Sequence, residues 1–249
     1  MSLPRRFVIG LDGCRRGWVG VKLDLDRAAP PDVLFFASFS DAVAGAGRPA
    51  AIAVDMPIGF LDVAEPGGRA CERVARSLLG PRRASVFSAP TRAALAHAEN
   101  YEEALAANRA SGDEEVGLSL QSFHLMKKMN EIDAAMSPAL QGLVRESHPE
   151  LAFAELNGGR PMRAGKKTAQ GRVERVAVLE KAGADYGLTR AVLDPKSHAS
   201  LKRRGAARDD LIDAAVVALS AVRMARGSAR VVPDPPPTDS KGLRMEIVV

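Results

Sequence analysis

Aspartates stand at the ends of two apolar segments in the first quarter of the sequence. Asp12 follows the run from Phe7 to Leu11, and Asp55 ends the run that starts at Ala50. Such runs are typical of buried strands, and a buried carboxylate costs several kcal/mol unless a cation or hydrogen-bond donors compensate it. Each acid alone could accept backbone N–H bonds in the following turn. Two of them at strand ends favour a shared polar site.

A third group of acids lies in the segment Arg208-Asp-Asp-Leu-Ile-Asp213. At about 100° per residue of helix, Asp210 and Asp213 are about 60° apart on one edge of a helix predicted over residues 209–226. Their i, i+3 spacing can present two oxygen ligands to one divalent cation. Capping and the helix macrodipole also favour acids at this place, so the spacing is compatible with both roles.

The fourth group is Glu146-Ser-His148-Pro-Glu150. Glu146 and His148 are predicted to share one face of a strand over residues 143–148, with Glu150 just past the break at Pro149. These groups could serve as metal ligand or general base, although a single His is more often a surface or hydrogen-bonded residue. We rank Glu150 first. The acids at the two strand ends and on the late helix together suit phosphoryl chemistry with two Mg²⁺ or Mn²⁺ ions about 4 Å apart.

The elements that must position these acids follow from periodicity. Alternation from Val19 to Leu25, after the run that ends at Asp12, predicts a β-hairpin, and strands over 33–37 and 50–55 extend it into a mixed sheet with a right-handed crossover. Helices are predicted from Ser40 and over 68–79, 91–97, 101–109, 116–136, 168–182 and 209–226. The fold class is α/β, a mixed five-stranded sheet flanked by helices, with a helical insertion between strand 4 and strand 5.

The segments are predicted to form one domain over residues 1–249. Its core comprises residues 1–55 and 143–232, and residues 56–142 form the helical insertion. A proline-rich spacer starts a tail over 233–249. Residues 243–249 could be an edge strand or a partner-binding segment, and a tail from Gly242 is compatible with exchange between two copies in a homodimer.

Composition excludes a disordered chain. Of 249 residues, 46% are apolar and 26% charged, and the formal net charge is +5, which is the balance of a soluble globular protein. The longest apolar stretch, residues 214–222, is about half of a membrane span, and the opening residues do not match a signal peptide, so we expect a cytoplasmic protein. Cys14 and Cys71 lack paired spacing, which favours buried free thiols over a zinc site.

Five segments together resemble an uncharacterised prokaryotic family of predicted RNase H-like nucleases, and the resemblance runs over nearly the whole chain. They are Gly10-Leu-Asp-Gly13 with the following Gly17-Trp-Val-Gly20, Ala53-Val-Asp-Met-Pro-Ile-Gly59, Ser85-Val-Phe87, Glu146-Ser-His-Pro-Glu150 and Asp209-Asp-Leu-Ile-Asp-Ala214. In the wider RNase H-like superfamily, which includes Holliday-junction resolvases, metal-binding acids sit on the first strand, at the end of the fourth strand and on a late helix. Asp12, Asp55 and the pair Asp210 and Asp213 match those places one by one.

The resulting hypothesis is a metal-dependent nuclease or related phosphodiester hydrolase that uses Mg²⁺ or Mn²⁺. Asp12 and Asp55 are the expected shared metal ligands, and Asp210 and Asp213 complete the site. Glu150 is expected to be an accessory ligand or base. The long helical segment after Asp55 departs from simpler nucleases of this fold, which leaves the substrate open between DNA, RNA, a hybrid, a junction and a small nucleotide.

Basic residues provide candidates for phosphate contacts. Arg69, Arg73 and Arg76 lie within about 60° of one another on the predicted helix 68–79, although a solvated face is the more usual meaning of such a stripe. We select Arg69, Arg73 and Lys166, because arginines and lysines that face an acidic centre could hold phosphates and make nucleic-acid binding salt-dependent. With 4% aromatic residues, backbone contact is favoured over base stacking.

Two other classes stay open. The turn from Asp12-Gly13 to Gly17 resembles the first phosphate loop of sugar kinases and actin-like ATPases, but the chain has no second loop of that kind and no Gly-x-x-x-x-Gly-Lys-Ser/Thr motif. A non-catalytic nucleic-acid-binding protein of the same fold is the other alternative. The acids at all three expected places argue against it.

Overall fold

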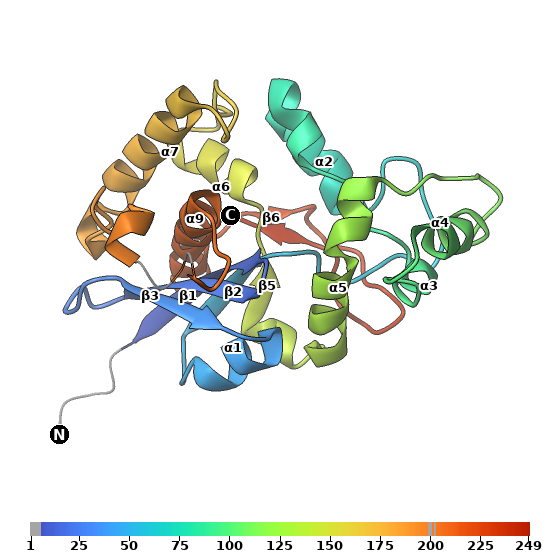
Figure 1. Cartoon of the computed structure of the whole chain (residues 1–249), viewed down its shortest axis with the longest axis horizontal. Helices are drawn as coiled ribbons and strands as arrows, with labels where there is room; N and C mark the ends of the chain where they lie inside the picture. Colours follow the sequence, from blue (N-terminus) through green and yellow to red (C-terminus); the bar gives the residue numbers. More distant parts are fainter. Residues whose placement is uncertain (1–5, 199–200, 202) are drawn as a thin grey trace. The chain divides into compact units, whose positions relative to one another are not determined.

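The computed structural model describes residues 6–198, 201 and 203–249 and divides into two compact units (Figure 1). The first unit comprises the segment up to Asp55, Leu143–Arg230 and Val248–Val249. The second comprises Met56–Gly142 and Val231–Ile247. In chain order, residues 56–142 come between the fourth and fifth strands of the first unit's sheet.

The first unit is built on a mixed five-stranded sheet, as predicted. Its strands are β1 (Phe7–Cys14), β2 (Gly17–Asp24), β3 (Asp32–Phe36), β4 (Ala51–Asp55) and β5 (Val144–Glu146). They lie in the order β3-β2-β1-β4-β5. The β1–β2 and β2–β3 pairs are antiparallel, whereas β4 pairs parallel with both β1 and β5. The register of the β1–β4 pair sets Asp12 directly beside Asp55.

Helices flank this sheet. They are α1 (Phe39–Gly45), α6 (Pro149–Leu156), α7 (Ala169–Ala182) and α9 (Arg208–Ala225), with short 3-10 turns at Ala184–Tyr186 and Pro195–His198. The α9 helix packs on β1, β2 and β4, and its residues from Leu211 to Val222 are all buried. This burial explains the apolar stretch over residues 214–222, since nearly every face of a central helix meets protein.

Gly10 allows this packing because its Cα faces the backbone of α9. A Cβ at this position would lie 2.2 Å from the Ala218 nitrogen and 2.3 Å from the Ala214 oxygen. Gly10→Ala is therefore expected to lower the free energy of unfolding by about 3 kcal/mol, the upper end for overpacking, because backbone atoms cannot rotate away. Urea denaturation measures it. Gly142→Ala is the matched control, since nothing lies within 4 Å of its added Cβ, and equal losses in both variants would contradict the prediction.

The second unit is mainly helical. It contains α2 (Ala70–Leu79), α3 (Arg92–Leu95), α4 (Tyr101–Arg109) and α5 (Leu120–Ala135), with 3-10 turns at Gly80–Ser85 and Leu140–Gly142. The prediction of α4 is confirmed at both ends. The predicted helix 116–136 is wrong at its start, because the Ser119 side chain accepts the N–H of Ser122 and caps the helix there.

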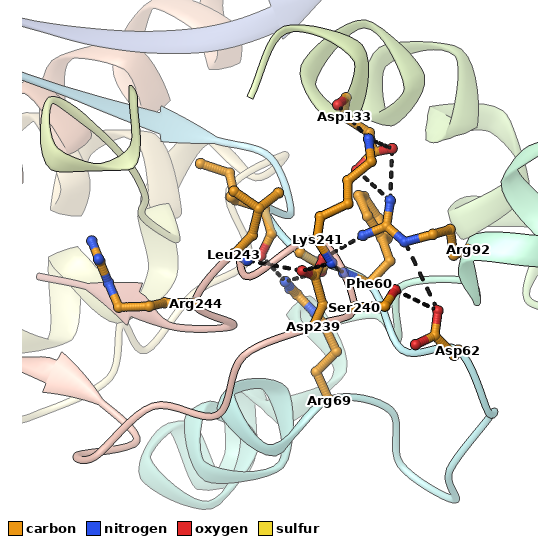
Figure 2. Close-up of polar contacts among 12 residues, drawn as sticks. Phe60, Asp62, Arg69, Arg92, Asp133, Asp239, Ser240, Lys241, Leu243 and Arg244 are labelled. Carbon is orange, nitrogen blue, oxygen red and sulfur yellow. Dashed lines mark hydrogen bonds and ion pairs between the residues drawn. The ribbon is translucent and has the colours of Figure 1, made fainter. Parts of the chain in front are cut away.

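An ion-pair cluster of Arg92, Asp133, Asp239 and Lys241 fixes the late segment of the second unit to its helices (Figure 2). Arg92 donates to both carboxylate oxygens of Asp133 at 2.7 Å and also pairs with Asp239. Lys241 donates to Asp133 at 2.6 Å. The Asp239 side chain is fully buried and accepts the N–H groups of Phe60 and Leu243 at 3.1 and 2.9 Å. Residues 233–247 of the tail thus fold as part of this unit.

Two further predicted elements, in addition to the helix 116–136, differ from the structure. The strand predicted over 143–148 ends at Glu146, and α6 begins at Pro149, a helix that the sequence analysis did not predict. Proline favours the first helical position because its fixed φ suits the helix and its missing N–H is not needed there. In the tail, the strand is limited to β7 (Ile247–Val248), which pairs with β6 (Val231–Val232).

Both cysteines, Cys14 and Cys71, are buried, as predicted. No described helix has the length and apolar character needed to cross a membrane.

Candidate metal centre

Three carboxylates from three elements of the first unit converge. Asp12 lies on β1, Asp55 ends β4 and Asp213 lies in the second turn of α9. One oxygen from each lies within 4.8 Å of the others. Asp12 is 8% exposed and Asp213 is 2% exposed, so two of the three are withdrawn from bulk water. The parallel register of β1 and β4 and the packing of α9 on both strands produce this convergence.

Burial and mutual repulsion act on all three acids. Burial raises the pKa of Asp12 well above its usual value, and the charges of Asp55 and Asp213 raise it further. The pKa of Asp55 is raised in the same way, by burial and then by Asp213. Burial also raises the pKa of Asp213, against the opposing charge of Lys166. A positive charge nearby would stabilise the ionised form of all three carboxylates.

The Asp12 carboxylate contributes one of the three converging oxygens and is 8% exposed. Buried carboxylates that repel one another are costly unless a cation compensates them. Three carboxylates form a hard, all-oxygen donor set, which fits Mg²⁺ or Mn²⁺ better than softer metals. The donor set therefore fits the metals expected from the sequence.

Lys166 contacts this cluster through Asp213. Its Nζ donates to Asp213 Oδ2 at 2.7 Å, with 42% of the Lys166 side chain exposed and 3% of that of Asp213. Burial alone would lower the pKa of Lys166, but the charges of Asp213, Asp55 and Asp12 outweigh it and raise the pKa. The sequence analysis selected Lys166 for phosphate contact and did not place it beside Asp213.

Asp210 lies outside the converging three. Its Oδ2 accepts the Ala207 N–H at 2.8 Å, so it caps the start of α9. Burial and the charge of Asp213 nevertheless raise the pKa of Asp210 to about 6. It therefore remains in the electrostatic surroundings of the centre, with one oxygen committed to the helix cap.

Glu150 also lies outside the three. It sits in the first turn of α6 and pairs with Arg175, and both side chains are almost fully buried. Glu146 is buried on β5, and His148 is the residue before α6 rather than part of the strand. The structure thus separates Glu146 and His148 into different elements, because the backbone turns into the helix at Pro149.

Arg69 and Arg73 belong to the second unit, where both make local contacts. Arg69 is 1% exposed; it pairs with Glu72 at 2.7 Å and donates to the carbonyl oxygens of Ile58 and Gly59. Arg73 is exposed and pairs with Glu65 at 2.7 Å. Arg69 therefore stabilises the loop before α2. The predicted arginine stripe is not uniformly exposed to solvent, because Arg69 is buried and Arg73 is exposed.

An arginine-lined cavity of about 340 Å³ lies beside α7 and the start of α9 in the first unit. Arg172, Arg190 and Arg208 line it together with one acid, Asp194, which accepts from Arg208 at 3.0 Å. Its remaining walls are apolar and come from Ala169, Val173, Val176, Leu193 and Ile212. The sequence analysis missed Arg190 and Arg208, because nothing in their spacing shows that the segment after α7 and the start of α9 line the same cavity.

The described fold and site define an α/β protein with a buried carboxylate centre. The chain belongs to the family described as "Protein of unknown function (DUF429)", whose family model matches residues 10–238. No curated protein and no solved structure matches the chain significantly.

Proposed function

We propose that this protein is a metal-dependent phosphodiester hydrolase of RNase H-like type that acts on nucleic acid. The observation that carries the proposal is the convergence of Asp12, Asp55 and Asp213 within 4.8 Å. Their positions on the first strand, at the end of the fourth and on a late helix are those that the resemblance to RNase H-like nucleases implies.

The chain's own residues supply the binding groups. Asp12, Asp55 and Asp213 would hold the ion, and Asp210 would add negative charge at the start of α9. A bound Mg²⁺ or Mn²⁺ supplies Lewis acidity toward a phosphoryl oxygen and offsets developing negative charge. Lys166 would present its ammonium to a phosphate at the same place, and the Glu150–Arg175 pair would support the elements around it.

The arginine-lined cavity supports a phosphate-bearing substrate. Guanidinium groups bind phosphate oxygens through paired N–H donors. The cavity lies close in sequence to the carboxylate centre, because α9 contributes Arg208 and Ile212 to the cavity and Asp213 to the centre. With three arginines and one acid lining it, the cavity has an excess of positive charge. Contacts of this type position a nucleic-acid backbone without reading its sequence.

Incubation with labelled DNA, RNA, hybrid and junction substrates in Mg²⁺, Mn²⁺ or EDTA tests the proposal, with ATP plus sugars in parallel. We expect strand cleavage that requires a divalent cation and is lost in Asp55→Asn, because the amide removes one charge from the donor set. Asp41→Asn is the matched control, since Asp41 is an exposed acid in α1.

The other outcomes discriminate between the alternatives. Phosphorylation of a sugar by ATP would favour the kinase-like class. Salt-sensitive binding of nucleic acid without turnover in any metal would favour a non-catalytic binding protein. Cleavage that persists in EDTA would contradict the metal-dependent proposal directly.

A further inference from the structure

We propose that the carboxylate centre binds a single divalent cation and that the ammonium group of Lys166 takes the place of a second one beside Asp213. This inference rests on the proposed function, since it concerns the same centre. It departs from the two-ion arrangement expected from the sequence.

Oxygen atoms that are already in use are the first argument. One oxygen each from Asp12, Asp55 and Asp213 converges within 4.8 Å, which is a donor set for one ion. The Lys166 ammonium donates to Asp213 Oδ2 at 2.7 Å, and Asp210 Oδ2 accepts the Ala207 N–H at 2.8 Å. A second ion beside Asp213 would have to displace the Lys166 ammonium.

The backbone that carries Lys166 is held from both sides. The Glu174 carboxylate accepts the N–H groups of Arg163 and Ala164 at 2.9 and 3.1 Å. The Thr168 hydroxyl donates to the Gly165 oxygen at 2.9 Å. These bonds fix residues 163–165 immediately before Lys166, so its side chain starts from a defined point.

Arg175 adds a buried support to the same loop. Its guanidinium donates to the Ala164 oxygen at 3.0 Å and to the Gly171 oxygen at 2.9 Å, while Glu150 binds the other side. Arg175 is 1% exposed and Glu150 5% exposed. This gives Glu150 a positioning role: through Arg175 it orients the loop that delivers Lys166.

Close packing leaves the loop little freedom to withdraw. A Cβ on Gly171 would lie 2.1 Å from the Gly165 oxygen and 2.9 Å from the Ala164 oxygen, so the first turn of α7 lies directly against the loop. A lysine on a free surface segment could swing away when a metal ion arrives. Here the side chain alone can move, and the three carboxylates that attract it stay in place.

Counting bound Mn²⁺ tests the inference. Calorimetric titration and electron paramagnetic resonance of the full chain should show one ion per wild-type molecule, with the six-line spectrum of an isolated Mn²⁺. Lys166→Met keeps the length of the side chain and removes the charge, so it should bind two ions with an exchange-coupled spectrum. Lys166→Arg should bind one. Lys167→Met is the matched control, because Lys167 is the exposed neighbour, and it should also bind one.

The outcomes separate the two proposals. Two ions in the wild type would overturn the single-ion inference and leave the metal-dependent function standing. One ion in Lys166→Met would show that the ammonium does not occupy a second place, and would overturn the inference as well. A wild-type protein that binds no Mn²⁺ would overturn the proposed function itself. Matching circular dichroism spectra confirm that each variant is folded.

Discussion

Asp12→Asn is expected to remove metal-dependent cleavage and, at the same time, to stabilise the metal-free protein. Loss of activity should be about 100-fold or more, since even the outer partners of metal ligands contribute 10- to 100-fold. Stability in EDTA should rise by about 1–2 kcal/mol, the usual gain for a single stabilising change. The gain arises because Asn relieves a buried charge that repels Asp55 and Asp213.

The difference in stability between Asp12→Asn and the wild type is expected to depend on pH. Because the folded-state pKa of Asp12 lies above its ordinary value of 3.8, the folded protein binds more protons than the unfolded chain just above pH 3.8. Stability therefore falls as pH rises through that window, by about 1.4 kcal/mol per pH unit for each proton. Asp12→Asn should remove one such contribution, so its advantage over the wild type should be small near pH 4 and larger at pH 8.

Calorimetric melting in EDTA at both pH values measures this effect. Added Mn²⁺ should raise the melting temperature of the wild type and leave that of Asp12→Asn nearly unchanged, because binding to the folded state stabilises it by mass action. Asp32→Asn, at an exposed acid on β3, is the control and should behave as the wild type does. If Asp12→Asn were less stable than the wild type in EDTA, Asp12 would be a structural acceptor instead of a ligand.

Asp239→Ala is expected to cost about 3–5 kcal/mol of stability, the range for removing one member of a buried ion pair. The carboxylate is fully buried and accepts backbone N–H groups of Phe60, Lys241 and Leu243 in addition to pairing with Arg92. Alanine leaves these three N–H groups without their side-chain acceptor and leaves Arg92 with Asp133 as its close partner (Figure 2).

Urea denaturation compared with Asp234→Ala measures the loss. Asp234 is an exposed acid of the same segment, and its removal should change the free energy of unfolding by less than about 0.5 kcal/mol. Asp239→Asn should fall between the two, because the amide oxygen keeps one acceptor and loses the charge. Equal stability of Asp239→Ala and Asp234→Ala would mean that the ion-pair cluster contributes nothing net.

Local patterns were enough to predict the sheet and the acids on it. The alternation of β2 predicts its strand, since side chains along a strand repeat every two residues, although both of its faces are buried except at Lys22. The apolar runs before Asp12 and Asp55 report burial directly, and the long apolar stretch 214–222 lies on the helix that packs on the sheet. These features concern residues close in sequence, for which spacing determines the shared face.

The sequence could not show which basic side chains form ion pairs with the acids. Lys166 and Asp213 are 47 residues apart, and no periodicity relates a loop lysine to a helix on another layer. The sequence analysis selected Arg69 for phosphate contact. An arginine is seldom buried, but Arg69 is, and Glu72 and two carbonyl oxygens compensate its charge. The buried pair of Arg175 and Glu150 likewise joins residues that are 25 positions apart. Pairing of this kind depends on tertiary contacts.

The chain passes between the two units at residues 55 and 56, 142 and 143, 230 and 231, and 247 and 248. The helical unit is thus assembled from two separate stretches of polypeptide, and no single continuous fragment of the chain contains this unit alone. A fragment that stops at Gly142 would lack Asp239 and Lys241, and with them the acceptor for Phe60 and one neutralising charge for Asp133. An expressed fragment that is meant to contain the helical unit must therefore include residues 231–247 together with residues 56–142.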